Sequence, residues 1–131
     1  MVLSSIALIT VTILGCGGGG ATDPTRPAPT QPVASRSDPV EQGKLIANEE
    51  GCLACHSTEG DVKVGPSWKG IYGSQEELAD GRTATVNETY IRNSIQNPGD
   101  DIVKGFENVM PVISLSDPEI ENIIAFIKSL E

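Results

Sequence analysis

Two cysteines and a histidine form a short stretch of this sequence whose residue types and spacing can carry chemistry. Cys52 and Cys55 are separated by two residues, and His56 follows directly. Thiols at this spacing lie on one turn of chain, so both can add to vinyl groups on the same edge of a porphyrin, and the next residue then offers its imidazole to the iron. The pattern therefore predicts one covalently attached c-type haem with His56 as an axial ligand.

Two other uses of a cysteine pair fit this sequence less well. A redox pair of the thioredoxin kind expects a strand–helix–strand context, and the sequence around Cys52 has no such pattern. A structural zinc ion needs four ligands. His56 is the only histidine, and the third cysteine, Cys16, is far away in the sequence. The haem interpretation is therefore favoured over both alternatives.

Only one residue is a candidate for a second soft ligand of the iron. Apart from Met1, the only methionine is Met110, so it is the sole candidate if the iron takes a second soft ligand. A single methionine is ordinarily a flexible filler of core gaps. Met110, however, precedes Pro111 in a loop far from any helical stripe. The sequence therefore favours Met110 as a ligand.

Length, composition and charge limit the class of protein. The chain has 131 residues, which allows one small domain. With one Trp, two Tyr and two Phe, an ordinary apolar core would be thin, and a covalent porphyrin would supplement it. The net charge of -9 argues against binding to nucleic acid or to acidic lipids, since both need clustered Lys and Arg.

The N-terminal part of the sequence has the features of an export signal and a tether. Residues 2–14 are uncharged and mostly apolar, but a spanning helix needs about 20 such residues. The run ends in Gly15-Cys16, as in a bacterial lipoprotein signal, although no Lys or Arg precedes it. We expect residues 1–15 to be a signal peptide, Cys16 to be lipidated and residues 16–37 to form a Gly- and Pro-rich linker. The alternative is an ordinary cleaved leader with an incidental Cys16.

The sequence predicts a helix at the start of a folded domain over residues 38–131. Asp38 is a typical N-cap and Pro39 suits the first helical position, so the helix should run to about Glu50 and stop at Gly51. Inside this helix, Gly43 costs about 1 kcal/mol relative to alanine. Its presence indicates that another helix approaches closely at this position.

Three further elements follow from caps, turns and spacing. Asn87 can cap a helix over residues 88–96, and an Asp-Gly turn predicts a possible small hairpin over residues 78–86. Ser116 begins a capping box for the last helix. Its apolar residues recur at spacings of three and four, at Ile120, Ile123, Ile124, Ile127 and Leu130. This stripe should pack on the first helix, which predicts an all-α fold.

The loop after the cysteine motif contains a candidate partner for His56. A histidine that ligates iron normally donates its other ring N–H to a carbonyl, which fixes the ring. Pro66 supplies a carbonyl and has no N–H of its own, so we expect His56 to donate to Pro66. The alternative is that Pro66 only forms a turn.

These features together resemble the class I cytochrome c family. An N-terminal helix precedes C-x-x-C-H, Gly65-Pro66 lies in the next loop, the middle helix ends in Asn97-Pro98, and Met110-Pro111 precedes a C-terminal helix. The resemblance covers residues 38–131. Within the family, segments 65–74, 78–81, 102–106 and 109–111 look like the cytochrome c domain fused to subunit II of bacterial caa3-type oxidases.

The resemblance implies a fold and a set of site residues. The terminal helices would pack around one covalent haem, and Gly65 and Pro66 would form the loop beside the axial histidine. The implied thioether sites are Cys52 and Cys55, and the implied axial ligands are His56 and Met110. The family's common Gly-Arg reads Gly73-Ser74 here, so Trp68, Tyr72 and Arg82 are proposed instead as contacts of the haem propionates.

The resemblance also implies a function in electron transport and not enzymatic activity. We expect a one-electron carrier between a quinol-oxidising complex and a terminal oxidase, anchored by lipid on the periplasmic face of the bacterial cytoplasmic membrane. An alternative is a fixed haem c subunit of a respiratory complex such as alternative complex III. A haem peroxidase is less consistent with the sequence, because no second histidine is available for proton transfer. No nucleic acid or small-molecule substrate is expected.

Overall fold

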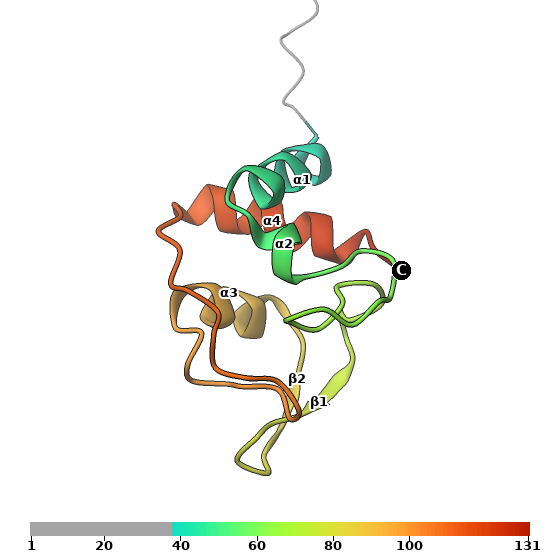
Figure 1. Cartoon of the computed structure of the whole chain (residues 1–131). Helices are drawn as coiled ribbons and strands as arrows, with labels where there is room; N and C mark the ends of the chain where they lie inside the picture. The colour runs from blue at the N-terminus through green and yellow to red at the C-terminus, as the bar shows by residue number, and fades with distance from the viewer. Residues whose placement is uncertain (1–37) are drawn as a thin grey trace, which may run out of the picture. The chain divides into compact units, whose positions relative to one another are not determined.

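The computed structural model describes residues 38–131, which contain four helices and one two-stranded sheet. The helices α1, α2 and α4 lie together at one end, the hairpin of β1 and β2 is at the far end, and α3 lies between them next to α4 (Figure 1). The predicted signal peptide, linker and lipidated Cys16 lie outside the described residues. No helix within residues 38–131 is long and apolar enough to cross a membrane.

Helix α1 (Pro39–Glu49) packs directly on helix α4 (Asp117–Lys128). The Asp38 side chain caps α1 by accepting a hydrogen bond of 3.0 Å from the Val40 N–H. Gly43 is buried, and its Cα lies so close to α4 that a Cβ would overlap the Asn122 carbonyl and lie 2.8 Å from the Cβ of Phe126. The predicted close approach at Gly43 is therefore confirmed, and α4 is the helix that approaches.

The core is formed mainly by the apolar stripe of α4. Its isoleucines are nearly or fully buried, as the spacing predicts, and Leu130 is partly buried. Phe126 is also buried, although it lies outside the predicted stripe. At the start of α4, the Glu119 carboxylate accepts hydrogen bonds from the Ser116 N–H (2.8 Å) and hydroxyl (2.6 Å). The apolar stripe and this cap together explain why α4 begins and packs where it does.

Two shorter helices complete the helical part. Helix α3 (Glu88–Gln96) begins where the sequence predicts, because the Asn87 side chain accepts a 2.9 Å hydrogen bond from the Tyr90 N–H. Helix α2 (Cys52–Cys55) is a single turn that was not predicted as a separate element. Gly51 has a φ of 76° and connects α1 to α2, so the predicted stop at Gly51 is also a change of direction.

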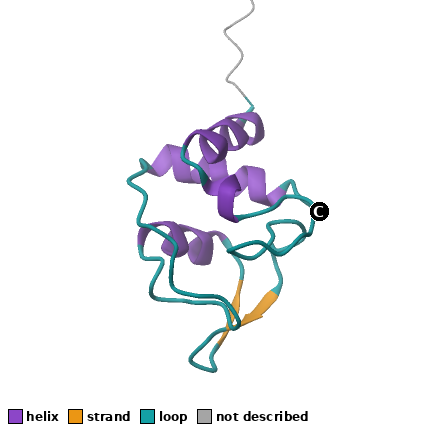
Figure 2. Ribbon diagram, in the orientation of Figure 1, coloured by secondary structure: helices purple, strands orange, loops and turns teal. Residues whose placement is uncertain are grey.

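The small hairpin is present, with a first strand that precedes the predicted region. Strand β1 (Gln75–Glu77) pairs antiparallel with β2 (Thr83–Thr85). Leu78 lies within the hairpin as predicted, because its N–H donates to the Arg82 carbonyl at 2.8 Å, and it also forms an isolated bridge with Val103. The mainly helical fold with paired terminal helices and a small hairpin is thereby confirmed (Figure 2).

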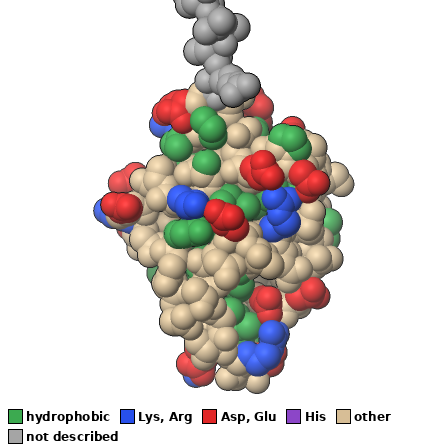
Figure 3. Space-filling view, turned by 180° about the vertical axis from the view of Figure 1, so that it is seen from behind, with side chains coloured by type: hydrophobic (Ala, Val, Ile, Leu, Met, Phe, Trp, Pro, Cys, Tyr) green, Lys and Arg blue, Asp and Glu red, His purple; other side chains and the backbone are tan. Residues whose placement is uncertain are grey.

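Ion pairs connect elements at the surface of the described part. Arg92 of α3 pairs with Asp117 (2.8 Å) and Glu121 (3.6 Å) of α4, and Lys128 of α4 pairs with Glu88 of α3 (2.8 Å). On the face turned away in Figure 1, the basic side chains lie beside acidic ones (Figure 3). Such exposed pairs each contribute at most about 1 kcal/mol, so they orient α3 on α4 more than they stabilise the fold.

Candidate haem site

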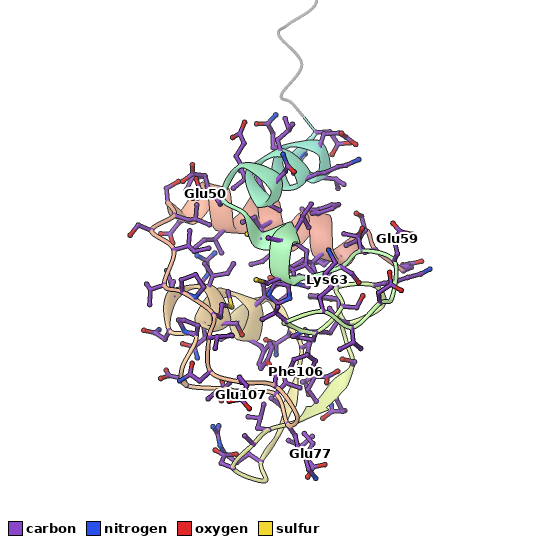
Figure 4. All side chains as sticks on the ribbon, in the orientation of Figure 1. Glu50, Glu59, Lys63, Glu77, Phe106 and Glu107 are labelled. Atoms are coloured by element: carbon purple, nitrogen blue, oxygen red, sulfur yellow. The ribbon has the colours of Figure 1, made fainter. Side chains whose placement is uncertain are left out.

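A mostly apolar cavity lies between the helices and the loops. Its walls come from residues 50–56, residues 64–71, α3 with the preceding Val86, the long loop of residues 98–115, and α4. Glu50 lies at the α1 side of the site and Glu107 on the long loop, and both line the cavity (Figure 4). The cavity therefore has contributions from segments that are far apart in the sequence.

The predicted thioether cysteines lie at the two ends of α2 and both line this cavity. Both are free thiols and both are partly buried. Burial raises the pKa of Cys52 above its ordinary value, so the thiol is the favoured form. Because α2 is one helical turn, Cys52 and Cys55 present two thiols at one end of the cavity.

His56 follows α2, and the orientation of its ring is fixed by Pro66 in the loop after the cysteine motif. The distance from Nδ1 of His56 to the Pro66 carbonyl oxygen is 2.8 Å. A carbonyl only accepts, so Nδ1 carries the proton and Nε2 of the neutral ring keeps its lone pair. Burial lowers the pKa of His56, which also favours the neutral form. The side chain is therefore oriented to offer Nε2 to a metal.

Gly65 lies against the imidazole of His56. A Cβ at Gly65 would come within 2.5 Å of Cε1 and 2.9 Å of Nδ1, which leaves room only for hydrogen. The Gly65 N–H also donates to the Cys55 carbonyl at 3.0 Å. Glycine at this position therefore allows the loop to reach the ring. The sequence pattern alone does not show why glycine is needed here.

Trp68 lines the cavity, and its indole stacks on His56. The ring centroids of Trp68 and His56 are 5.1 Å apart, and the ring planes are inclined by 22°. The sequence predicted that Trp68 contacts a propionate, and the structure adds a contact with the predicted iron ligand. Trp68 also meets Phe126 of α4 edge to face, with centroids 6.2 Å apart.

Met110 lies on the long loop and lines the same cavity as His56. Its side chain is partly buried and packs on the hydrophobic core. The start of the loop is held by the end of β1 and the residues after it, because the Lys104 N–H donates to the Glu77 carbonyl and the Ala79 N–H donates to the Ile102 carbonyl, both at 2.8 Å. The structure thus brings together the two predicted axial ligands from segments that are far apart in the sequence.

The remaining two predicted haem contacts, Tyr72 and Arg82, are not among the residues that line the cavity. Arg82 instead pairs with Asp80 (2.6 Å) and Asp101 (2.9 Å) and donates to the Asp100 carbonyl (3.2 Å). It connects the turn of the hairpin to the start of the long loop. The Tyr72 ring packs on the core and lies 4.9 Å from the Lys128 Nζ.

Several polar groups at the site were not predicted as site residues. Tyr90 and Ser94 of α3 line the cavity one helical turn apart, and burial raises the pKa of Tyr90. Asn108 lines it from the long loop. Tyr90 and Ser94 are four residues apart and so share one face of α3, but sequence spacing does not show that this face borders a cavity. Together with Asn108, they add hydroxyl and amide groups to a mostly apolar wall.

The residues present fit a covalent haem. Two free thiols on one turn, a histidine nitrogen with a free lone pair and a methionine sulfur all line one mainly apolar cavity. Thiols bind the porphyrin edge, and imidazole with thioether is an established ligand pair for haem iron. The donor set and the apolar walls are therefore of the type that this group requires.

Comparisons with known proteins agree with this conclusion. The family model described as cytochrome c matches residues 40–131. The solved structure of cytochrome cH from Methylobacterium extorquens is similar, with 26% sequence identity and a TM-score of 0.50, and the match covers 69% of this chain and 97% of that chain. Curated protein sequences give no match.

The fold and the site define an electron-transfer protein with a class I cytochrome c fold and one covalent haem c. The chain belongs to the cytochrome c family. This class of protein transfers electrons and is not an enzyme in its own right.

Proposed function

We propose that this chain is a one-electron carrier whose haem is attached through Cys52 and Cys55 and whose iron is held by His56 and Met110. The observation that carries this proposal is that all four side chains line one cavity, with the His56 ring already oriented by Pro66. When bound, the haem supplies an iron that changes between ferric and ferrous states, and His/Met ligation raises its reduction potential.

The protein's own part in this function is to bind, orient and exclude water. The hydrogen bond from His56 to Pro66 holds the imidazole in one tautomer. The apolar walls lower the local dielectric constant, which tunes the potential of a redox centre. With side chains assigned to both axial positions, the site has no position for a substrate, as suits a carrier.

Substitution of Met110 tests the ligand assignment. We expect Met110→Ala to remove the far-red ferric absorption band that arises from sulfur–iron ligation and to lower the reduction potential. Val112→Ala is a matched control, because Val112 is an exposed residue of the same loop that does not line the cavity. An unchanged far-red band in Met110→Ala would remove Met110 from the site.

We further propose that the donor is a quinol-oxidising complex and the acceptor a terminal oxidase, on the periplasmic side of the cytoplasmic membrane. The proposed lipid on Cys16 would keep the carrier at that membrane. The support for these partners is the resemblance to cytochrome domains of caa3-type oxidases. Stopped-flow mixing with purified candidate complexes should give fast reduction by one and fast oxidation by the other.

Purification in detergent separates a free carrier from a fixed subunit. A carrier should purify alone, whereas co-purification at constant stoichiometry would instead indicate a haem subunit of a complex such as alternative complex III. Cys16→Ser should move the protein to the soluble fraction. Continued retention on the membrane would contradict lipidation of Cys16 as the sole anchor.

A further inference from the structure

Trp68 makes face contact with the ring of the proposed proximal ligand. The centroid distance of 5.1 Å and the small interplanar angle of 22° to His56 correspond to an offset stack. Trp68 is the only tryptophan of the chain and is 8% exposed. A large, rigid and nearly buried side chain therefore lies against His56.

The indole of Trp68 is itself supported by the core. Phe126 of α4 meets it edge to face, with an interplanar angle of 81°. Phe126 is buried and lies at the point where α1 crosses α4 next to Gly43. The three rings of His56, Trp68 and Phe126 thus form a continuous series from the site to helix α4.

The backbone at Trp68 is also held relative to His56. The Trp68 N–H donates to the Ser57 carbonyl at 2.8 Å. The buried Ser57 hydroxyl donates to the Asp61 carbonyl at 2.6 Å, and its oxygen lies 3.0 Å from the Ser67 hydroxyl, which can donate to it. These bonds fix residues 67 and 68 beside residues 56 and 57, so the indole has little freedom to move away from the imidazole.

A hydrogen bond and a ring stack restrict different motions of His56. The bond from Nδ1 to Pro66 fixes one edge of the imidazole but leaves the ring able to tilt about the N–H···O direction. A flat group against the ring face opposes that tilt. The two contacts together determine the plane of the imidazole, whereas either contact alone does not.

We propose that Trp68, supported by Phe126, is a positioning residue that sets the orientation of the His56 imidazole plane at the iron. This inference rests on the proposed ligation by His56 and goes beyond it, because it assigns a second determinant of the ring besides Pro66. The imidazole plane determines how the ligand orbitals overlap with those of the iron. Magnetic spectra of the ferric protein report that overlap.

The test compares Trp68→Leu and Trp68→Phe in the full-length, haem-loaded protein. Electron paramagnetic resonance gives the g values of the ferric iron, and proton NMR gives the spread of the haem methyl resonances. We expect Trp68→Leu to shift both, and Trp68→Phe to lie close to the wild type because its ring restores the stack. Ferric spectra of a folded Trp68→Leu protein that match the wild type would overturn the proposal.

Two further variants separate positioning from general loss of stability. Ile124→Ala removes a buried α4 side chain outside the cavity lining, so it should lower the melting temperature and leave the ferric spectra unchanged. Phe126→Leu should shift the spectra in the same direction as Trp68→Leu, by less. A spectral shift in Ile124→Ala equal to that of Trp68→Leu would also overturn the proposal.

The same spectra separate this inference from the proposed function. If His56 were not the ligand, the wild-type protein itself would lack the signals of an imidazole-ligated low-spin iron. If His56 is the ligand and Trp68 does not position it, the wild-type signals are present and the Trp68→Leu spectra match them.

Discussion

Leu78 and Val103 form a single antiparallel bridge between the end of β1 and the loop that carries Met110. The Leu78 side chain is 1% exposed, so this bridge is also a buried contact. The position of Met110 therefore depends on a hairpin at the opposite end of the domain from α1 (Figure 1).

Leu78→Ala should loosen the Met110 loop. Truncation of a buried leucine costs about 2–5 kcal/mol, and the loss here falls on the bridge that fastens this loop. We expect the far-red sulfur–iron band to disappear on heating at a lower temperature than the helical circular dichroism signal. Leu45→Ala, at an exposed leucine, is the control. Coincident transitions in Leu78→Ala would show that the bridge has no local effect on the loop.

Gly43→Ala should destabilise the domain although alanine is the better helix former. The helix propensity gain is about 1 kcal/mol. The new Cβ would overlap the Asn122 carbonyl, and overpacking of this kind costs about 1–3 kcal/mol or more. We expect a lower midpoint of thermal unfolding, whereas Lys44→Ala at the exposed neighbouring position should change it little. A raised midpoint in Gly43→Ala would contradict this prediction.

Gly65→Ala should displace the His56 ring. A Cβ at this position would lie 2.5 Å from Cε1 of His56, so the ring or the loop must move. We expect less haem incorporated per chain and a changed reduction potential in the fraction that is loaded. Gly99→Ala is the matched control, because its Cβ would meet no atom closer than the Asn108 amide nitrogen at 3.4 Å. Equal haem content and potential in both variants would refute the prediction.

The cap of α4 should make stability depend on pH in the acid range. Hydrogen bonds from the Ser116 hydroxyl and N–H hold the pKa of Glu119 below its usual value of 4.5. A carboxyl with a lowered folded-state pKa contributes stability above the unfolded pKa and loses it as pH falls through the folded value. Glu119→Gln should therefore be less stable than the wild type at neutral pH, with the difference closing in acid. Denaturant unfolding across the acid range measures this difference in stability. Glu41→Gln, in the first turn of α1, is the control.

The acidic balance should control reactions with charged redox partners. With a net charge of -9, the protein attracts cations, and salt screens that attraction over a Debye length of about 10 Å at 0.1 M. Oxidation by a cationic metal complex should slow as salt is added, and oxidation by an anionic complex should accelerate. Glu107→Gln and Glu41→Gln each remove one negative charge, but only Glu107 lines the cavity. We therefore expect Glu107→Gln to weaken both salt trends more than Glu41→Gln does. Equal effects of the two variants would place electron exchange elsewhere on the surface.

Local signals predicted the helices well. The caps at Asp38, Asn87 and Ser116 mark the observed starts of α1, α3 and α4, because capping depends on a few adjacent residues. The close approach at Gly43 was also predictable, since glycine inside a helix needs a packing reason. The short α2 was missed because one helical turn after a glycine has no periodicity to detect.

Contacts between distant segments were not predictable in the same way. The bridge between Leu78 and Val103 and the ion pair between Arg82 and Asp101 depend on how the long loop returns to the hairpin. The stack of Trp68 on His56 depends on the three-dimensional path of the loop after the cysteines. The residues of the cysteine motif and Met110 were predictable as members of one site, as was the contact of His56 with Pro66. The positions of Tyr72 and Arg82 away from the cavity were not.

The contact of α1 with α4 joins the first and last elements of the folded domain. A chain that emerges from a ribosome in sequence order cannot form this contact until the 12 residues of α4 have emerged. Until then Gly43 has no helix to pack on, and the α4 side of the cavity is absent. The two thiols of α2 therefore stay open until α4 has emerged, and closure of the domain follows as the last step.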